Sequence, residues 1–312
     1  NAQVALPTFQ GVQFAGSELY SFSSHTFTNC GATGRSGPTL ANCKSSYSTT
    51  WENDTDLFNV QTQGIQEWTV PITGTYRIEA YGAQGGNGSG SSTGGLGARM
   101  RGDFSLTKGE VIKIMVGQQG GGDGNSVGGG GGTFVIKSPY NNTASILVIA
   151  GGGGGEAQHS IGTPAGQTTN NGAVGGNSGG SAGTSGNAGG SVKFATGGAG
   201  FSGNSSLIGY NSGSQWSVIA YSFVNGGVGA RGSTSYGEDN SLGGFGGGGA
   251  SCSCSTGGGG GGGGYSGGGG GGPQNYGSYS FGGGGGSYNA GSNTSNSSGA
   301  RSGHGQVIIT LN

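Results

Sequence analysis

Glycine constrains this chain more than any other residue type. It supplies 84 of the 312 residues, against a usual share of about 7%. Much of it lies in uninterrupted tracts at residues 128–132, 151–155, 246–249, 257–264, 267–272 and 282–286. Ordering a residue costs roughly 1 to 2 kcal/mol of backbone entropy, and glycine loses the most freedom of all residue types. Ordered tracts therefore need dense hydrogen bonding in return.

The tracts fit two different structures. Isolated tracts would be flexible linkers, whereas several tracts of similar length can lie side by side as left-handed threefold helices, the polyglycine II form of polyproline II. Glycine keeps its N–H for bonds to neighbouring tracts, and Phe245, Tyr265 and Phe281 stand at tract edges, where aromatic rings could cover a bundle. We therefore expect an inserted bundle of polyglycine II helices between about residues 84 and 300. Only 6 prolines and no Gly-X-Y repeat exclude collagen.

The segments between the tracts predict β-strands. No window of eleven residues shows helical apolar spacing, so we expect almost no α-helix. In residues 75–81, Tyr76 and Ile78 would face a core while Arg77 and Glu79 face outward. Other β-rich runs lie at residues 111–116, 133–137, 146–150, 217–224 and 306–311. The sequence therefore predicts an all-β sandwich with strands over about residues 27–150, 215–225 and 303–312.

Composition argues against nucleic-acid binding and against a membrane span. Charged residues make up 7% of the chain, with Lys plus Arg at 11 and Asp plus Glu at 12, so no basic field is present to hold a phosphate backbone. No apolar run reaches the 18 to 20 residues that cross a bilayer. We expect no nucleic-acid partner and no membrane span in this chain.

The motifs of catalysis and metal binding are weak or missing. Matches to GxGxxG arise by chance in glycine-rich sequence and precede no amphipathic helix that could bind a pyrophosphate. The three histidines His25, His159 and His304 have no metal-type spacing. No Gly-x-Ser-x-Gly motif stands between a strand and a helix. We expect a protein without enzymatic activity, cofactor, metal site or catalytic residue.

Cysteines and N-glycosylation sequons point to an oxidising, extracellular compartment. Cys30 and Cys43 bracket a short loop whose closure would stabilise the fold by roughly 3 kcal/mol, so we expect them to pair. Cys252 and Cys254, two residues apart, could form a strained ring, bond to a neighbouring chain or remain thiols. Candidate glycosylation sites are Asn53, Asn141, Asn204, Asn293 and Asn296.

A series of motifs follows in order from about Phe27 to the C-terminus. These motifs are the segments 27–34, 37–39 with Cys43, 66–71, 74–86, 108–110, 116–120, 129–135, 147–154, 243–252, the tract ending at Tyr265, and 303–307. In this order they resemble the glycine-rich domain family of the anaplastic lymphoma kinase and leukocyte tyrosine kinase ectodomains. The resemblance implies a jelly-roll-like β-sandwich, similar to tumour necrosis factor, with an inserted polyglycine II bundle.

One departure from the family bears on function. In those receptors an acidic stretch after the last long glycine tract helps to bind basic cytokines, whereas residues 265–304 contain no Asp or Glu here. The resemblance therefore does not predict a receptor-type cytokine site in this chain.

These observations predict a glycine-rich protein that is secreted or lies at the cell surface and has a structural or adhesive role. One such role is that of a self-assembling subunit of a surface filament or matrix. Residues 1–26 lie outside the family match and are rich in apolar residues, so they could add as a strand to a neighbour's sheet, or fold back onto the sandwich of residues 27–312. The alternatives are a soluble receptor-like ligand-binding ectodomain and a glycan-binding adhesin. The expected partners are further copies of the chain or other extracellular proteins or glycans.

Overall fold

Two antiparallel sheets form a β-sandwich. A computed structural model describes residues 17–88, 92–123, 126–157, 162, 164–206, 209–210, 214–215, 218–232, 241–252, 257–273 and 280–312. The first sheet, in spatial order, contains β1 (Ser24–Phe27), β15 (Gln306–Leu311), β4 (Gly74–Tyr81), β5 (Gly97–Leu106) and β14 (Ser292–Arg301). The second contains β13 (Tyr288–Asn289), β10 (Ile146–Ala150), β9 (Thr133–Ile136), β6 (Val111–Met115), β3 (Ile65–Thr69) and β2 (Phe58–Thr62).

The remaining elements are short. The described residues add one α-helix, α1 (Leu40–Ser46), and two 3₁₀ turns, η1 (Thr143–Ser145) and η2 (Phe223–Asn225). They also add the two-residue strand pairs β7 (Gly122–Asp123) with β8 (Ser126–Val127), and β11 (Gly209–Tyr210) with β12 (Ser214–Gln215). The chain crosses between the two main sheets from β3 to β4 and again from β5 to β6. The predicted all-β sandwich with almost no α-helix is confirmed.

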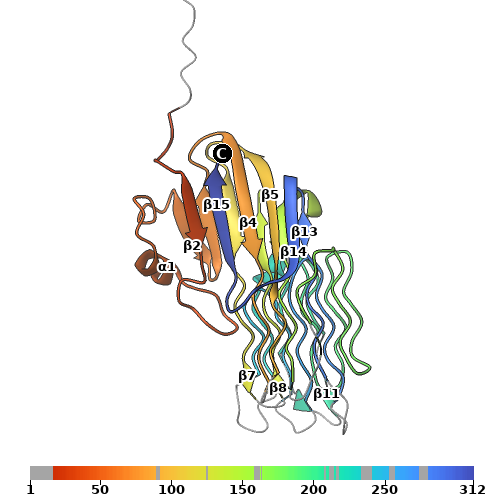
Figure 1. The fold of residues 1–312 in the computed structure, drawn as a ribbon. Coiled ribbons are helices and arrows are strands. Elements are labelled where there is room, and N and C mark those ends of the chain that lie inside the picture. Colours follow the sequence, from red (N-terminus) through yellow and green to blue (C-terminus); the bar gives the residue numbers. More distant parts are fainter. Residues whose placement is uncertain are drawn as a thin grey trace, which may run out of the picture.

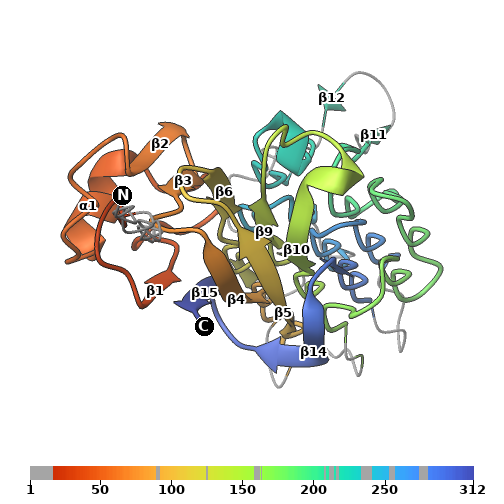
Figure 2. The ribbon, with the colours of Figure 1, turned by 90° about the horizontal axis from the view of Figure 1, so that it is seen from above.

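The core lies between the two sheets and is aromatic at one edge. Trp68, Tyr76 and Phe27 are fully buried there, and the rings of Trp68 and Tyr76 meet edge to face with centroids 5.8 Å apart. Such large rings bury the most apolar area per residue, and edge-to-face pairs add further stabilisation. This edge is where α1, β1 and β2 meet (Figure 2).

The central strands of the second sheet are largely buried on both faces. Along β6 and β9, Ile114 and Val135 point into the sandwich, while Met115 and Phe134 point outward into a second apolar cluster. Rings from the glycine-rich part of the chain complete this cluster, and they belong to Phe201, Phe223, Phe245 and Tyr265. This two-sided burial explains why β9 and β10 read as nearly continuous apolar runs, whereas the half-buried Lys113 interrupts the run in β6.

The glycine tracts form a bundle that extends from one end of the sandwich (Figure 1). In tract 151–155, Gly152 donates to Gly263 and Gly155 donates to Gly260, so bonds to the same neighbouring tract recur every three residues. Tract 282–286 lies on another side and donates back to the same two glycines. Three residues is the period expected of the predicted threefold helices, and the polyglycine II conformation itself stays a prediction.

Dense backbone bonding replaces side-chain packing inside the bundle. The six long tracts are buried along their whole length. A Cβ added to almost any of these glycines would approach a neighbouring carbonyl closer than 3.0 Å. The tracts are therefore structural elements rather than linkers, because their close approach requires the absence of a side chain.

Two sequence expectations need correction or refinement. The expected strand over residues 215–225 is not continuous in its described part: Gln215 belongs to the short strand β12, Val218 forms an isolated bridge with Arg231, and residues 223–225 form the η2 turn. Its apolar residues pack into the bundle, where Ala220 lies in a cluster of alanines and Phe223 covers the second sheet. At the N-terminus, residues 24–27 fold back as β1 and pair with β15, while residues 1–16 lie outside the described residues.

Candidate interaction surface

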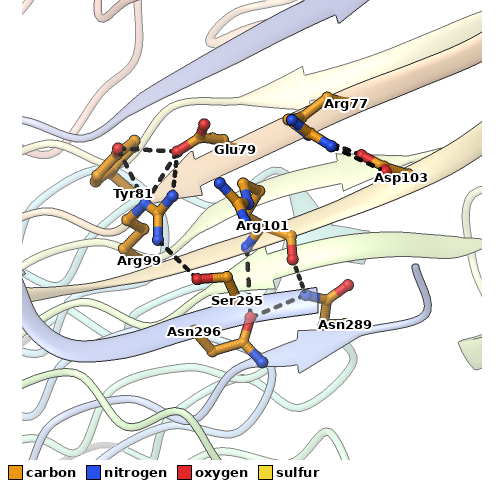
Figure 3. Close-up of polar contacts among 9 residues, drawn as sticks. All are labelled: Arg77, Glu79, Tyr81, Arg99, Arg101, Asp103, Asn289, Ser295 and Asn296. Atoms are coloured by element: carbon orange, nitrogen blue, oxygen red, sulfur yellow. Dashed lines mark hydrogen bonds and ion pairs between the residues drawn. The ribbon is translucent and has the colours of Figure 1, made fainter. Parts of the chain in front are cut away.

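The outer face of the first sheet carries several charged residues from the neighbouring strands β4 and β5. Because residues alternate along a strand, Arg77 and Glu79 of β4 point outward while Tyr76, Ile78 and Ala80 point into the core. The same alternation on β5 turns three more charged residues outward. Together Arg77, Glu79, Arg99, Arg101 and Asp103 form what we call the charged sheet face (Figure 3).

Two ion pairs order this face. Arg77 donates to both carboxylate oxygens of Asp103, with Nε–Oδ1 at 2.9 Å and Nη2–Oδ2 at 3.1 Å, directly across the strand pair. Hydrogen bonds from Arg77 and Asn293 lower the pKa of Asp103 to about 2. Arg99 binds Glu79 diagonally, with Nη2 and Oε2 2.7 Å apart. Bidentate geometry of the kind that joins Arg77 to Asp103 fixes the side chains as well as attracting them.

Arg101 is held in the same face but makes no ion pair with a described residue. It stands opposite Glu79 in the strand register, yet the Glu79 oxygen Oε2 is used by Arg99 and by the hydroxyl of Tyr81. The Arg101 Nε is buried and has no hydrogen-bond partner. Its backbone is fixed by β14 and the preceding segment, since Arg101 N–H donates to Asn296 and its carbonyl accepts from Asn289. The face therefore presents one uncompensated guanidinium.

The candidate glycosylation sites are exposed in the structure. All five predicted sequon asparagines, Asn53, Asn141, Asn204, Asn293 and Asn296, are exposed. Asn293 and Asn296 lie on β14 at the edge of the charged sheet face, and Asn293 Nδ2 donates to Asp103 at 3.0 Å. Asn87 begins a sixth sequon, Asn-Gly-Ser, and is also exposed. Their occupancy stays a prediction.

The cysteines lie at two separate places. Cys30, which follows β1, forms a disulfide with Cys43 of α1, and this bond ties the helix to the aromatic edge of the core. Cys252 is buried beside the bundle and is also disulfide-bonded. Cys254 lies outside the described residues. In the described part of the chain no group of His, Cys, Asp and Glu could hold a metal ion.

Sequence reasoning found only part of the charged sheet face. The alternation over residues 75–81 placed Arg77 and Glu79 outward correctly. Arg99, Arg101 and Asp103 were missed, although the spacing Arg-Met-Arg-Gly-Asp is itself an alternating pattern. Two glycines in that strand weaken its β-propensity, and only the pairing of β4 with β5 brings the two sets of charges together.

Comparison with known proteins identifies a relative among receptors. Over 95 residues the chain is 42% identical to the leukocyte tyrosine kinase receptor of Mus musculus. The matched stretch covers 30% of this chain and 11% of that receptor. The chain thus corresponds to a small part of the receptor's length, and the match supports the predicted relation to its ectodomain region. No family model matches the chain. No helix in the described ranges has the length and apolar character needed to cross a membrane.

Proposed function

We propose that this chain is an extracellular structural protein whose copies assemble head to tail into a filament or matrix. The observation that carries the proposal is the bundle, in which the glycine tracts are joined by many backbone-to-backbone hydrogen bonds. Such bonding makes the bundle stiff, and its glycines offer no reactive side chains. The disulfide at Cys30 and Cys43 and the likeness to a receptor segment support an extracellular location.

Residues 1–16 are the proposed assembly segment. The apolar residues Tyr20 and Phe22 pack into the chain's own core, and Leu19 N–H bonds to Pro71, so residues from 17 onward serve their own sandwich. The sequence before them supplies further apolar side chains, which belong to Val4, Leu6, Phe9, Val12 and Phe14. Such a segment is suited to strand addition at a neighbour's open sheet edge.

Truncation tests the assembly segment without damaging the fold. Deleting residues 1–16 keeps β1, which is required by β15, and should convert multimers to monomers with an unchanged melting temperature. A second variant of full length replaces Phe9, Val12 and Phe14 with serine and should also fail to assemble, because the apolar anchors are lost. Light scattering and negative-stain imaging give the readout. Multimers that survive both changes would reject the segment's role.

A receptor-like ligand-binding ectodomain is the second candidate, and the likeness to the leukocyte tyrosine kinase receptor favours it. In that case the protein would remain monomeric at all concentrations and would bind a separate protein through an exposed sheet face. Sedimentation of the full chain over a range of concentrations separates the two functions, because only the structural protein multimerises.

A further inference from the structure

Arg101 is the residue of the charged sheet face that is suited to bind a carboxylate from outside. Arg77 is held by Asp103 and Arg99 is held by Glu79, so Arg101 is the one arginine of this face without an acidic partner among the described residues. An arginine fixed at its backbone and unpaired at its guanidinium can bind a carboxylate with two parallel hydrogen bonds. The paired charges around it would orient an incoming acidic group rather than compete for it.

The same chain carries unpaired carboxylates in the turn before β2. Asp54 and Asp56 are both exposed, and neither forms an ion pair with any described residue. The turn has a defined shape, since Asp54 Oδ1 accepts from the N–H of Asp56 and the carbonyl of Asp54 accepts from Phe58 N–H. We call residues 53–56 the acidic turn. It presents two carboxylates close together on an ordered backbone.

The two features lie at opposite edges of the sandwich. The acidic turn follows Trp51, whose ring lies 4.9 Å from the ring of His25 on β1, and β1 is the outermost strand at one side of the first sheet. Arg101 lies on β5, next to β14 at the other side. Figure 2 shows α1 and β2 far from β14 across the molecule. The acidic turn of one chain therefore cannot reach its own Arg101.

We propose that the acidic turn of one copy docks on the charged sheet face of the next, with Asp54 or Asp56 paired to Arg101. A contact between two different surfaces of identical chains is heterologous, and when it does not close into a ring it produces a filament. Charge complementarity of this kind fixes register and speeds association. The inference rests on the proposed self-assembly and adds a second, polar contact to the one made by residues 1–16.

Charge reversal with mixing tests this contact. Arg101→Glu alone, and Asp54→Arg with Asp56→Arg, should each raise the concentration needed for assembly by at least about tenfold, because like charges then meet. An equimolar mixture of the two variants should assemble, since the carboxylate introduced at position 101 of one then faces the arginines introduced in the acidic turn of the other. Sedimentation measures both. Lys193→Glu, an equal change of charge on the bundle, should assemble as the unaltered chain does.

Each outcome has one meaning. Restored assembly in the mixture supports the pairing, and its weakening as ionic strength rises supports a charged contact. If the unaltered chain assembles and both variants do so equally well, the pairing is wrong while self-assembly stands. If the unaltered chain stays monomeric, the contact between copies is rejected along with the proposed assembly. Binding of polygalacturonate by that monomer, but not by Arg101→Glu, would then assign the site to an acidic glycan.

Discussion

At the scale of single residues, the bundle depends on the absence of a Cβ. Gly259, Gly260 and Gly261 face three different tracts, and a Cβ on each would overlap the carbonyl of Gly155, Gly249 or Gly268 respectively. The atoms nearest to each added Cβ are backbone atoms, so no flexible side chain could move aside. A methyl group would therefore push whole tracts apart and weaken several N–H to C=O bonds, each worth about 0.5 to 1.5 kcal/mol.

The first residue-scale prediction is that alanine at any one of these three positions lowers the free energy of unfolding by at least about 2 kcal/mol. Thermal unfolding followed by circular dichroism measures it. Gly109→Ala is the control, because Gly109 has a positive φ but open space around it, and this change should cost only about 1 kcal/mol. Unchanged melting in all three bundle variants would mean that the tracts do not pack closely.

A second residue-scale prediction concerns His25. Its ring is enclosed by Phe27, Tyr47 and Trp51, and burial lowers its pKa from 6.5 to about 4, with the nearby Glu52 opposing this. The unfolded chain therefore binds more protons than the folded chain between these two pH values. The free energy of unfolding should fall as pH is lowered from about 6.5 to about 4, by at most about 3 kcal/mol from this residue.

The comparison variant for His25 is His25→Phe, which keeps a ring among the aromatic neighbours and removes the titrating group. Urea unfolding at several pH values should show a shallower loss of stability in the variant. Burial also lowers the pKa of His304, and its Nδ1 accepts from the N–H of Gln119, so a smaller loss of the same sign should remain. Parallel pH profiles for the two proteins would show that His25 is not buried as described.

At the scale of elements, sequence patterns predicted the strands that show regular alternation or continuous apolar runs. Residues 75–81, 111–116, 133–137, 146–150 and 306–311 correspond to β4, β6, β9, β10 and β15. The strand β14 could not be predicted, because its Ser- and Asn-rich residues are mostly exposed and its position is set by pairing with β5. The helix α1 is too short to show helical spacing, and a capping box of Thr39 and Asn42 begins it.

The element-scale prediction concerns the loop that contains α1. The disulfide closes a short loop, and in the chain-entropy model its removal costs about 3 kcal/mol. Cys30→Ala with Cys43→Ala should lower the free energy of unfolding by this amount, measured in urea. The accompanying change in structure should be confined to this loop. The near-ultraviolet signals of Tyr47 and Trp51 should therefore weaken, because α1 packs on that edge. If reduction of the disulfide in the unaltered chain leaves the near-ultraviolet signals of Tyr47 and Trp51 unchanged, the prediction is wrong.

At the scale of the whole molecule, the sandwich and the bundle are joined by rings rather than by a linker. Phe245 is fully buried, and its ring fills the space beside Gly37 and Gly64. An aromatic ring from the bundle thus packs directly against two glycines of the N-terminal part. The positions of Phe245 and Tyr265 at tract edges predicted that their rings cover a surface. The sequence did not predict which surface, and in the structure it is the outer face of β3, β6, β9 and β10. Tertiary structure alone supplies that partner.

The recurrence of bonding partners at every third residue also limits how such a protein changes length during evolution. Adding one or two glycines to a tract would turn every later residue toward the wrong neighbour, whereas adding three restores the original facing. In the predicted threefold helix, an insertion of three codons is therefore the smallest that returns every later residue to its original neighbour.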